Sequence, residues 1–195
     1  RVRYEYLGLL EQHRERESKY VIDKMPFNYT YIGFALALFP ETKIIYVKRE
    51  PVANCLSIFF RRFSPEMGFA FQSNEIAQRF VLHQSVMDFW IKRYKERILP
   101  ASYDSLVGGF QVEMNRILEW LDLEWTEDIM QFHRHKRPVR TSSWNDVRRP
   151  LYSTALEKWK NHKPLARQIR SDLRRAERHR SDFCQVRNQD RQLLC

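Results

Sequence analysis

KIIYVKREPVANCLSIFFR, residues 43–61, is the stretch that decides the fold. It opens with an apolar run, Ile44 to Val47, which predicts a short β-strand buried on both faces. Pro51 cannot continue a strand interior but suits the first turn of a helix, and an apolar periodic run from Val52 to Arg61 predicts that helix. Such a unit places backbone N–H groups and a positive dipole end at the carboxyl edge of a parallel sheet, where anions bind. We therefore expect an α/β protein with an anion site at this turn.

Three side chains of this stretch are candidates for that site. Arg49 ends the predicted strand, Ser57 lies about two helical turns into the helix, and Arg61 lies four positions beyond Ser57, so that both can face the same way. Two guanidinium groups and a hydroxyl converging on one spot would suit a dianionic phosphate. Taken alone, the spacing favours the simpler interpretation, a buried strand and helix with Arg49 in a structural ion pair.

Composition narrows the possible classes of protein. With 195 residues, of which 43% are hydrophobic and 14% aromatic, the chain can form one domain with a core. Its net charge of +10 fits an anionic ligand or partner, such as a nucleotide, nucleic acid, sulfated glycan or membrane surface. No GxxxxGK[ST] and no GxGxxG occurs, so a Walker loop and a dinucleotide fingerprint are excluded. No apolar run approaches membrane-spanning length.

The cysteines point to a reduced compartment. Cys55, Cys184 and Cys195 are widely spaced and odd in number, which predicts neither a disulfide framework nor a metal site. We therefore expect a cytoplasmic protein. The first residue is Arg, inside what looks like a helix, so we also expect a fragment or a trimmed chain.

A second segment, residues 19–40, places a lysine where it can act on a ligand. Asp23-Lys24-Met25-Pro26 follows a short candidate strand, Tyr20–Ile22, and precedes an apolar helix expected from about Tyr29 to Phe39. A lysine in such a turn can neutralise charge that builds on a transferred group. The alternative is a surface lysine paired with Asp23.

These motifs, in this order, resemble the sulfotransferases that use 3′-phosphoadenosine-5′-phosphosulfate, in particular bacterial enzymes related to the tyrosylprotein sulfotransferases. Their 3′-phosphate-binding strand and helix carry Arg-acid-Pro and a serine eight residues after the arginine, which Arg49, Pro51 and Ser57 match, with Glu50 where Asp is commoner. The resemblance implies that Arg49, Ser57 and Arg61 bind the 3′-phosphate.

The lysine turn and two later segments extend the resemblance. Residues 23–28 match the family's DKxPxN pattern, which implies that Lys24 stabilises the sulfuryl group in flight. Residues 103–107 match a Tyr-acid-x-Leu motif whose tyrosine, here Tyr103, lies near the nucleotide, although a core tyrosine is about equally compatible. Basic residues 133–159 match a segment that implies a role for Ser143 in holding the transferred group and for Lys158 in reaching the nucleotide phosphates. A solvated basic loop is the alternative for this segment.

The resemblance runs from about Tyr20 to Ile169 and implies a fold and a reaction. The fold is a P-loop-NTPase-like parallel sheet flanked by helices, and the reaction is metal-free, in-line transfer of a sulfuryl group to an acceptor hydroxyl or amine. The acceptor is a small molecule, a carbohydrate or a peptide, and a eukaryotic source would allow the Golgi lumen. The family's first strand with its 5′-phosphosulfate loop, and its general base, have no counterpart before Tyr20, so this chain is expected to be incomplete for catalysis.

We divide the chain into a sulfotransferase domain, residues 1–165, and a basic, mostly helical tail, residues 166–195, that need not pack tightly. A basic, non-catalytic module that binds nucleic acid or sulfated glycan is the rival class. The sequence contains no nucleic-acid-binding motif, which disfavours a nucleic-acid partner.

Overall fold

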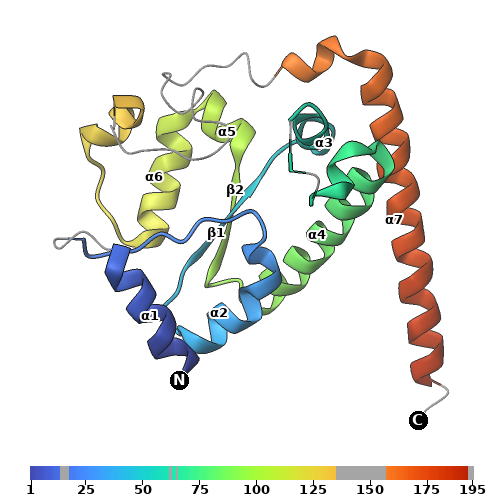
Figure 1. The fold of residues 1–195 in the computed structure, drawn as a ribbon. Coiled ribbons are helices and arrows are strands. Elements are labelled where there is room, and N and C mark those ends of the chain that lie inside the picture. The colour runs from blue at the N-terminus through green and yellow to red at the C-terminus, as the bar shows by residue number, and fades with distance from the viewer. Residues whose placement is uncertain (14–17, 62, 65, 135–156, 193–195) are drawn as a thin grey trace.

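A computed structural model describes residues 1–13, 18–61, 63–64, 66–134 and 157–192 (Figure 1). In this part of the chain, a small parallel sheet of two strands is flanked by helices, which gives a helix-rich α/β fold. The α-helices and strands, with short 3-10 helices (η), are α1 Val2–His13, η1 Asn28–Tyr31, α2 Ile32–Leu38, β1 Ile44–Lys48, α3 Pro51–Phe59, η2 Gly68–Phe71, α4 Ser73–Arg93, β2 Ile98–Ser102, α5 Tyr103–Gly108, α6 Phe110–Leu121, η3 Glu127–Arg134, η6 Lys158–Asn161 and α7 Lys163–Gln192.

Strands β1 and β2 run in parallel, with Ile44 opposite Ile98 and Lys48 opposite Ser102. In Figure 1 the strands lie between α6 on one side and α2 and α4 on the other. Because both strands end at the same edge of the sheet, the residues that follow them meet there. This edge carries the candidate site.

Strand β1 is confirmed, but the expectation that it is buried on both faces is wrong. Ile44 and Tyr46 pack against a core cluster that contains Met87 of α4. Ile45 and Val47 point to the opposite face and are 39% and 55% exposed. The side chains of a strand alternate between faces, and the core cluster lies on the face of Ile44 and Tyr46.

The expected strand at Tyr20–Ile22 is also not formed. Residues 20–25 have no regular structure, and Tyr20 and Ile22 are 64% and 90% exposed. Their β-branched and aromatic composition suits a strand, but a strand needs a hydrogen-bonded neighbour, and within the described residues β1 pairs only with β2. The helix expected next is present, as η1 followed by α2.

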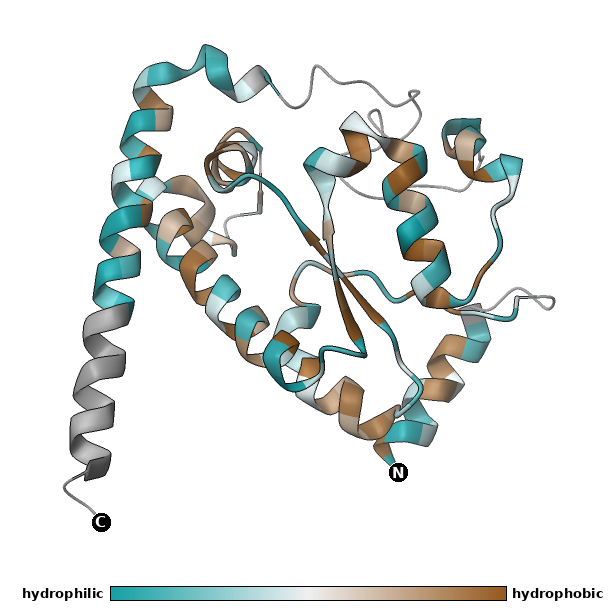
Figure 2. Ribbon diagram, turned by 180° about the vertical axis from the view of Figure 1, so that it is seen from behind, coloured by the Kyte–Doolittle hydropathy of each residue, from teal (hydrophilic) through white to brown (hydrophobic). Residues whose placement is uncertain are grey.

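Helix α7 packs more tightly than its arginine-rich sequence predicts. Ala166, Ile169, Leu173 and Ala176 are buried in a core cluster with residues of α3 and α4, among them Cys55. Four small or aliphatic residues at helical spacing form a narrow apolar stripe, and Figure 2 shows it as brown segments between teal ones. The expected loose packing is therefore wrong for this part of the tail, whereas the division of the chain at residue 165 stays a prediction.

Arg97, just before β2, holds the segment between α2 and β1 in place through hydrogen bonds. Its guanidinium donates hydrogen bonds to the backbone oxygens of Phe39 at 2.6 Å and of Leu36 and Thr42 at 3.2 Å each. Its own backbone oxygen accepts a bond from the Ile44 amide at 2.8 Å. One residue thus satisfies carbonyls at the end of α2 and fixes where β1 begins.

Two absences hold for the described residues. None of their helices is long and apolar enough to cross a membrane. No group of three or more His, Cys, Asp or Glu side chains among them is placed to hold a metal ion.

Candidate functional site

Arg49 and Tyr103 meet at the carboxyl edge of the sheet. They follow the paired residues Lys48 and Ser102, so the parallel register brings them side by side although 54 positions separate them in the chain. The guanidinium carbon of Arg49 lies 4.9 Å from the centroid of the Tyr103 ring, and both side chains are half-buried. This cation–π contact holds a positive charge beside the start of α3.

A hydrogen bond between Glu50 and Asp104 links the turn after β1 to the start of α5. The backbone N–H of Glu50 donates to the Asp104 carboxylate at 3.0 Å, which ties the β1–α3 turn to α5. The Glu50 carboxylate caps α3 by accepting from the Ala53 amide at 2.5 Å. Glu50 was noted only as a substitute for a commoner Asp, and the structure gives it this capping role. The Asp104 contact is non-local, and no sequence spacing signals it.

Glu113 of α6 stabilises the end of β2, next to Tyr103, through a hydrogen bond with the backbone. It is 8% exposed and accepts from the Ser102 amide at 3.0 Å and from the Arg116 guanidinium at 2.7 Å. The bond from Arg116 lowers the Glu113 pKa, because it stabilises the ionised carboxylate. The Ser102 hydroxyl in turn caps α5, by accepting from the Ser105 amide at 3.1 Å. Residues Glu113 and Arg116 were missed in the sequence, where their i, i+3 spacing resembles any exposed helical pair.

Ser57 and Arg61 lie on and just beyond α3. Ser57 is half-buried within the helix, but α3 ends at Phe59, so Arg61 is not the next turn of that helix as expected. Its amide still bonds the Ile58 oxygen at 3.0 Å, and its side chain is half-buried. The convergence of Arg49, Ser57 and Arg61 on one anion stays a prediction.

Lys24 is exposed, and it is not the partner of Asp23. The Asp23 carboxylate instead accepts from the Tyr6 hydroxyl at 2.5 Å and from the Asn28 side-chain amide at 3.1 Å. The first of these bonds raises the pKa of Tyr6 to about 12. Among the described residues, the Lys24 ammonium has no hydrogen bond or ion pair, so the alternative of an Asp23–Lys24 pair is wrong.

Behind the Lys24 turn, Arg79 of α4 lies among three aromatic rings. Its guanidinium carbon is 5.4 Å from the ring centroid of Phe27, 5.7 Å from that of Tyr29 and 5.6 Å from that of Phe69. Phe69 therefore packs inward, against the core cluster that contains Ile76. Sequence reasoning missed Arg79, because its spacing on α4 is that of an ordinary exposed position.

His83, one turn beyond Arg79, is packed between two aromatic rings. Its ring lies 4.6 Å from that of Tyr29 and 5.4 Å from that of Tyr46. Burial lowers the His83 pKa, and the positive charge of Arg79 lowers it further. It has the environment of a neutral core imidazole.

Two of the predicted site residues fall at the limit of what is described. Ser143 lies outside the described residues. Lys158 begins η6, and only its backbone belongs to the described part.

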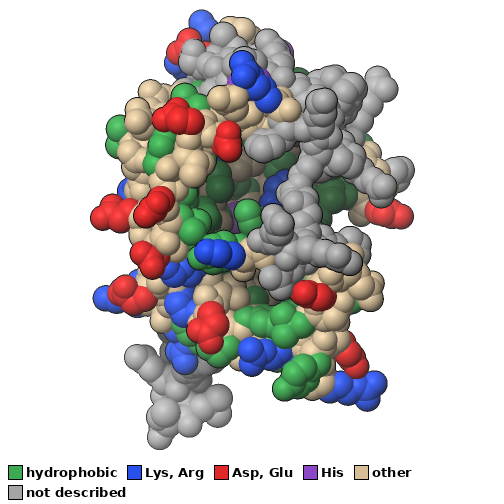
Figure 3. All heavy atoms as spheres, turned by 90° about the vertical axis from the view of Figure 1, so that its left-hand side faces the viewer, with side chains coloured by type: hydrophobic (Ala, Val, Ile, Leu, Met, Phe, Trp, Pro, Cys, Tyr) green, Lys and Arg blue, Asp and Glu red, His purple; other side chains and the backbone are tan. Residues whose placement is uncertain are grey.

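Figure 3 shows the face on the α1 and α6 side, where acidic and basic side chains are intermixed around exposed apolar groups.

Comparison with known proteins connects this chain to one family. The chain is 30% identical over 151 residues to an uncharacterized protein of Aquifex aeolicus, covering 76% of this chain and 20% of that protein. It is 25% identical over 166 residues to the protein-tyrosine sulfotransferase of Drosophila melanogaster, covering 78% of this chain and 32% of that enzyme. The chain therefore spans about a fifth and a third of the lengths of these two relatives. The sulfotransferase family model matches residues 2–127, well over half of the chain. The protein is a member of the sulfotransferase family.

Proposed function

We propose that this chain supplies the 3′-phosphate part of a sulfotransferase site, in a P-loop-like fold, with 3′-phosphoadenosine-5′-phosphosulfate as the donor. The observation that supports this most directly is the Arg49–Tyr103 pair at the carboxyl edge of two parallel strands, beside the N-terminus of α3. An anion at this edge is favoured both by the guanidinium and by the helix dipole. Family membership makes a phosphate of the sulfuryl donor the anion to test first.

Each candidate residue then has a role that its position allows. Arg49 offers a planar fork for the 3′-phosphate, and its cation–π contact with Tyr103 holds that fork at the sheet edge. Ser57 and Arg61 add a hydroxyl and a second charge from α3 and the residues after it. The two carboxylates of these turns, Glu50 and Asp104, each accept a hydrogen bond from a backbone amide, so their charge is partly offset beside the arginine.

Lys24 is assigned to the transferred group. In sulfuryl transfer the bond from sulfur to the bridging oxygen of the donor breaks while a bond from sulfur to the acceptor oxygen or nitrogen forms. Charge builds on the moving group and on the leaving phosphate. The exposed Lys24 ammonium, which has no carboxylate partner among the described residues, can stabilise that charge. We assign Ser143 to the same group and Lys158 to the nucleotide phosphates. The acceptor's proton passes to a base that none of these residues provides.

The acceptor to test first is a tyrosine hydroxyl in a peptide. The relative from Drosophila melanogaster is named a protein-tyrosine sulfotransferase, which supports this choice over a small molecule or carbohydrate. Because this chain covers 32% of that enzyme, binding of the nucleotide is a sharper first test than turnover.

Titration calorimetry with two nucleotides tests the assignment of Arg49. One charge-assisted hydrogen bond contributes roughly 1.5–3 kcal/mol, so Arg49→Ala is expected to weaken binding of 3′,5′-adenosine bisphosphate about tenfold to a hundredfold. Binding of 5′-AMP, which lacks the 3′-phosphate, is expected to change far less. Arg93→Ala, an exposed arginine at the end of α4, is the control with the same net charge. Equal losses for the two nucleotides, or equal losses for the two variants, would refute the assignment.

A further inference from the structure

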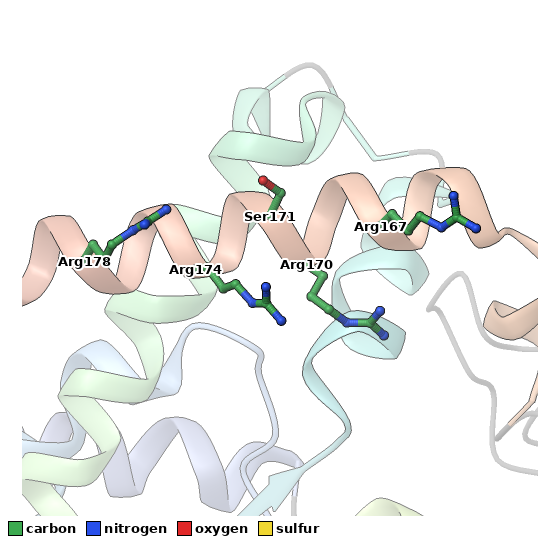
Figure 4. A pocket seen from close by; sticks show the side chains of 5 residues that line it. All are labelled: Arg167, Arg170, Ser171, Arg174 and Arg178. Carbon is green, nitrogen blue, oxygen red and sulfur yellow. The ribbon is translucent and has the colours of Figure 1, made fainter.

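A row of arginines runs along one side of α7, and we call it the arginine stripe. Arg167, Arg170, Arg174 and Arg178, with Ser171 between them, line an open groove of about 440 Å³ (Figure 4). All five residues are exposed. At about 100° per residue, the four arginines fall within an arc of about 80° on the helix. They therefore form one continuous band of positive charge.

The stripe is not neutralised by the described part of the protein. No Asp or Glu lines the groove. Two carboxylates lie within two residues of the stripe's arginines. Asp172 is 3% exposed and accepts from the Ser73 hydroxyl at 2.8 Å, and Glu177 is exposed but does not line the groove. Within the described residues none of the four guanidinium groups has an ion pair or a hydrogen bond, whereas Arg180 further along donates to Ser85 at 2.9 Å. Four unpaired like charges on one face repel one another, and a polyanion relieves that repulsion.

The spacing of the stripe fits an extended acidic peptide. Arg170, Arg174 and Arg178 succeed one another every four residues, which is about 6 Å along the helix axis. In an extended chain, alternate side chains on one face are about 6.6–6.8 Å apart. A guanidinium fork also matches a carboxylate with two parallel hydrogen bonds. From Arg167 to Arg178 the stripe spans about 16.5 Å, the length of about five extended residues.

Other polyanions fit the stripe less well. Single-stranded nucleic acid is usually held by aromatic side chains on which bases stack, and no aromatic residue lines the groove. A duplex major groove is about 12 Å wide and admits one bare helix, whereas α7 packs along α4. A membrane surface would be met by an apolar helix face, but the apolar residues of α7 are buried against α3 and α4.

We propose that the arginine stripe of α7 is a docking surface for an extended protein segment with acidic residues at alternate positions. This surface lies on a different element from the Arg49 edge, so the proposal goes beyond the nucleotide site and does not depend on it.

Fluorescence anisotropy with labelled twelve-residue peptides, at about 50 mM salt, tests the proposal on the full chain. One peptide alternates Glu and Ser, and the other has the same composition in Glu-Glu-Ser-Ser repeats. We expect the alternating peptide to bind several times more tightly. The double variant Arg170→Gln, Arg174→Gln is expected to weaken binding of the alternating peptide about threefold to thirtyfold, since each exposed ion pair contributes little to the binding free energy.

The control is the double variant Lys92→Gln, Arg175→Gln, which has the same net charge and removes exposed cations outside the groove. We expect it to change the affinity less than about twofold. An equal loss in the two double variants would show a general charge effect and overturn the proposal. Tighter binding of a DNA duplex or of a sulfated glycan than of the alternating peptide would overturn it as well.

Discussion

Replacing Arg97 by methionine should loosen the start of the sheet, because one guanidinium satisfies three carbonyls there. Methionine keeps an unbranched apolar stem but cannot donate. The bond to Phe39, at 2.6 Å, is the short one, and the bonds to Leu36 and Thr42, at 3.2 Å, are weaker. With about 1.5 kcal/mol for the short bond and about 0.5–1 kcal/mol for each long one, the loss is about 2.5–3.5 kcal/mol.

Urea unfolding followed by far-UV circular dichroism measures this loss. The expected fall in the free energy of unfolding corresponds to a drop in melting temperature of roughly 5–14 °C for a chain of this size. Arg97→Lys should recover part of it, because an ammonium can still donate to one carbonyl. Arg93→Met removes an exposed arginine from the end of α4 and should cost less than about 1 kcal/mol.

The reasoning also predicts where the structure loosens. The Thr42 amide bonds the Phe39 oxygen at 3.0 Å, within the connection that Arg97 fastens, so it should exchange with solvent faster in Arg97→Met. A loss below about 1 kcal/mol, or a lysine variant as stable as the parent, would show that water replaces these bonds at little cost.

Two further substitutions test packing and pH dependence. Gly33→Ala should destabilise the fold by about 1–2 kcal/mol, because the new Cβ would lie 2.8 Å from the ring of Trp90. Gly8→Ala has open space around it and should stabilise α1 by about 0.5–1 kcal/mol. Urea unfolding that shows the same sign of change for both variants would contradict this. The folded-state pKa of His83 lies below 6.5, so the folded protein binds its proton less readily than the unfolded chain. The contribution of His83 to stability is present above about pH 6.5 and is lost as the pH falls toward the folded-state pKa. A His83→Gln variant should therefore show a flatter dependence of the unfolding free energy on pH, from about pH 7 to about pH 5.5. An unchanged profile would refute the packed neutral imidazole.

Much of the local structure could be predicted from neighbouring residues. The apolar run after Lys43 correctly predicted strand β1, and Pro51 correctly predicted the first turn of α3. Both predictions succeed because β-propensity and the fixed φ of proline act within a few residues. Several motifs in the right order, among them those of Lys24, Arg49 and Tyr103, resembled the sulfotransferase family, and the family match confirms this prediction.

Contacts between distant segments could not be predicted this way. The Tyr20–Ile22 segment has the composition of a strand, but whether it becomes one depends on a neighbour that its own residues do not specify. Arg97, Glu113 and Arg79 each look like ordinary polar positions in the sequence. Their roles arise from partners that only the folded chain brings within reach.

The sequence alone determined the family and those elements that depend on neighbouring residues, and tertiary structure decided which residues share a site. Arg49 and Tyr103 each belong to a motif that could be recognised, but their contact depends on the parallel register of β1 and β2. Likewise, the arginines of α7 are visible in the sequence as a charge run. Burial of Ala166 and Leu173 against the core fixes which side of that helix faces the protein, and so leaves the arginine stripe open to a partner.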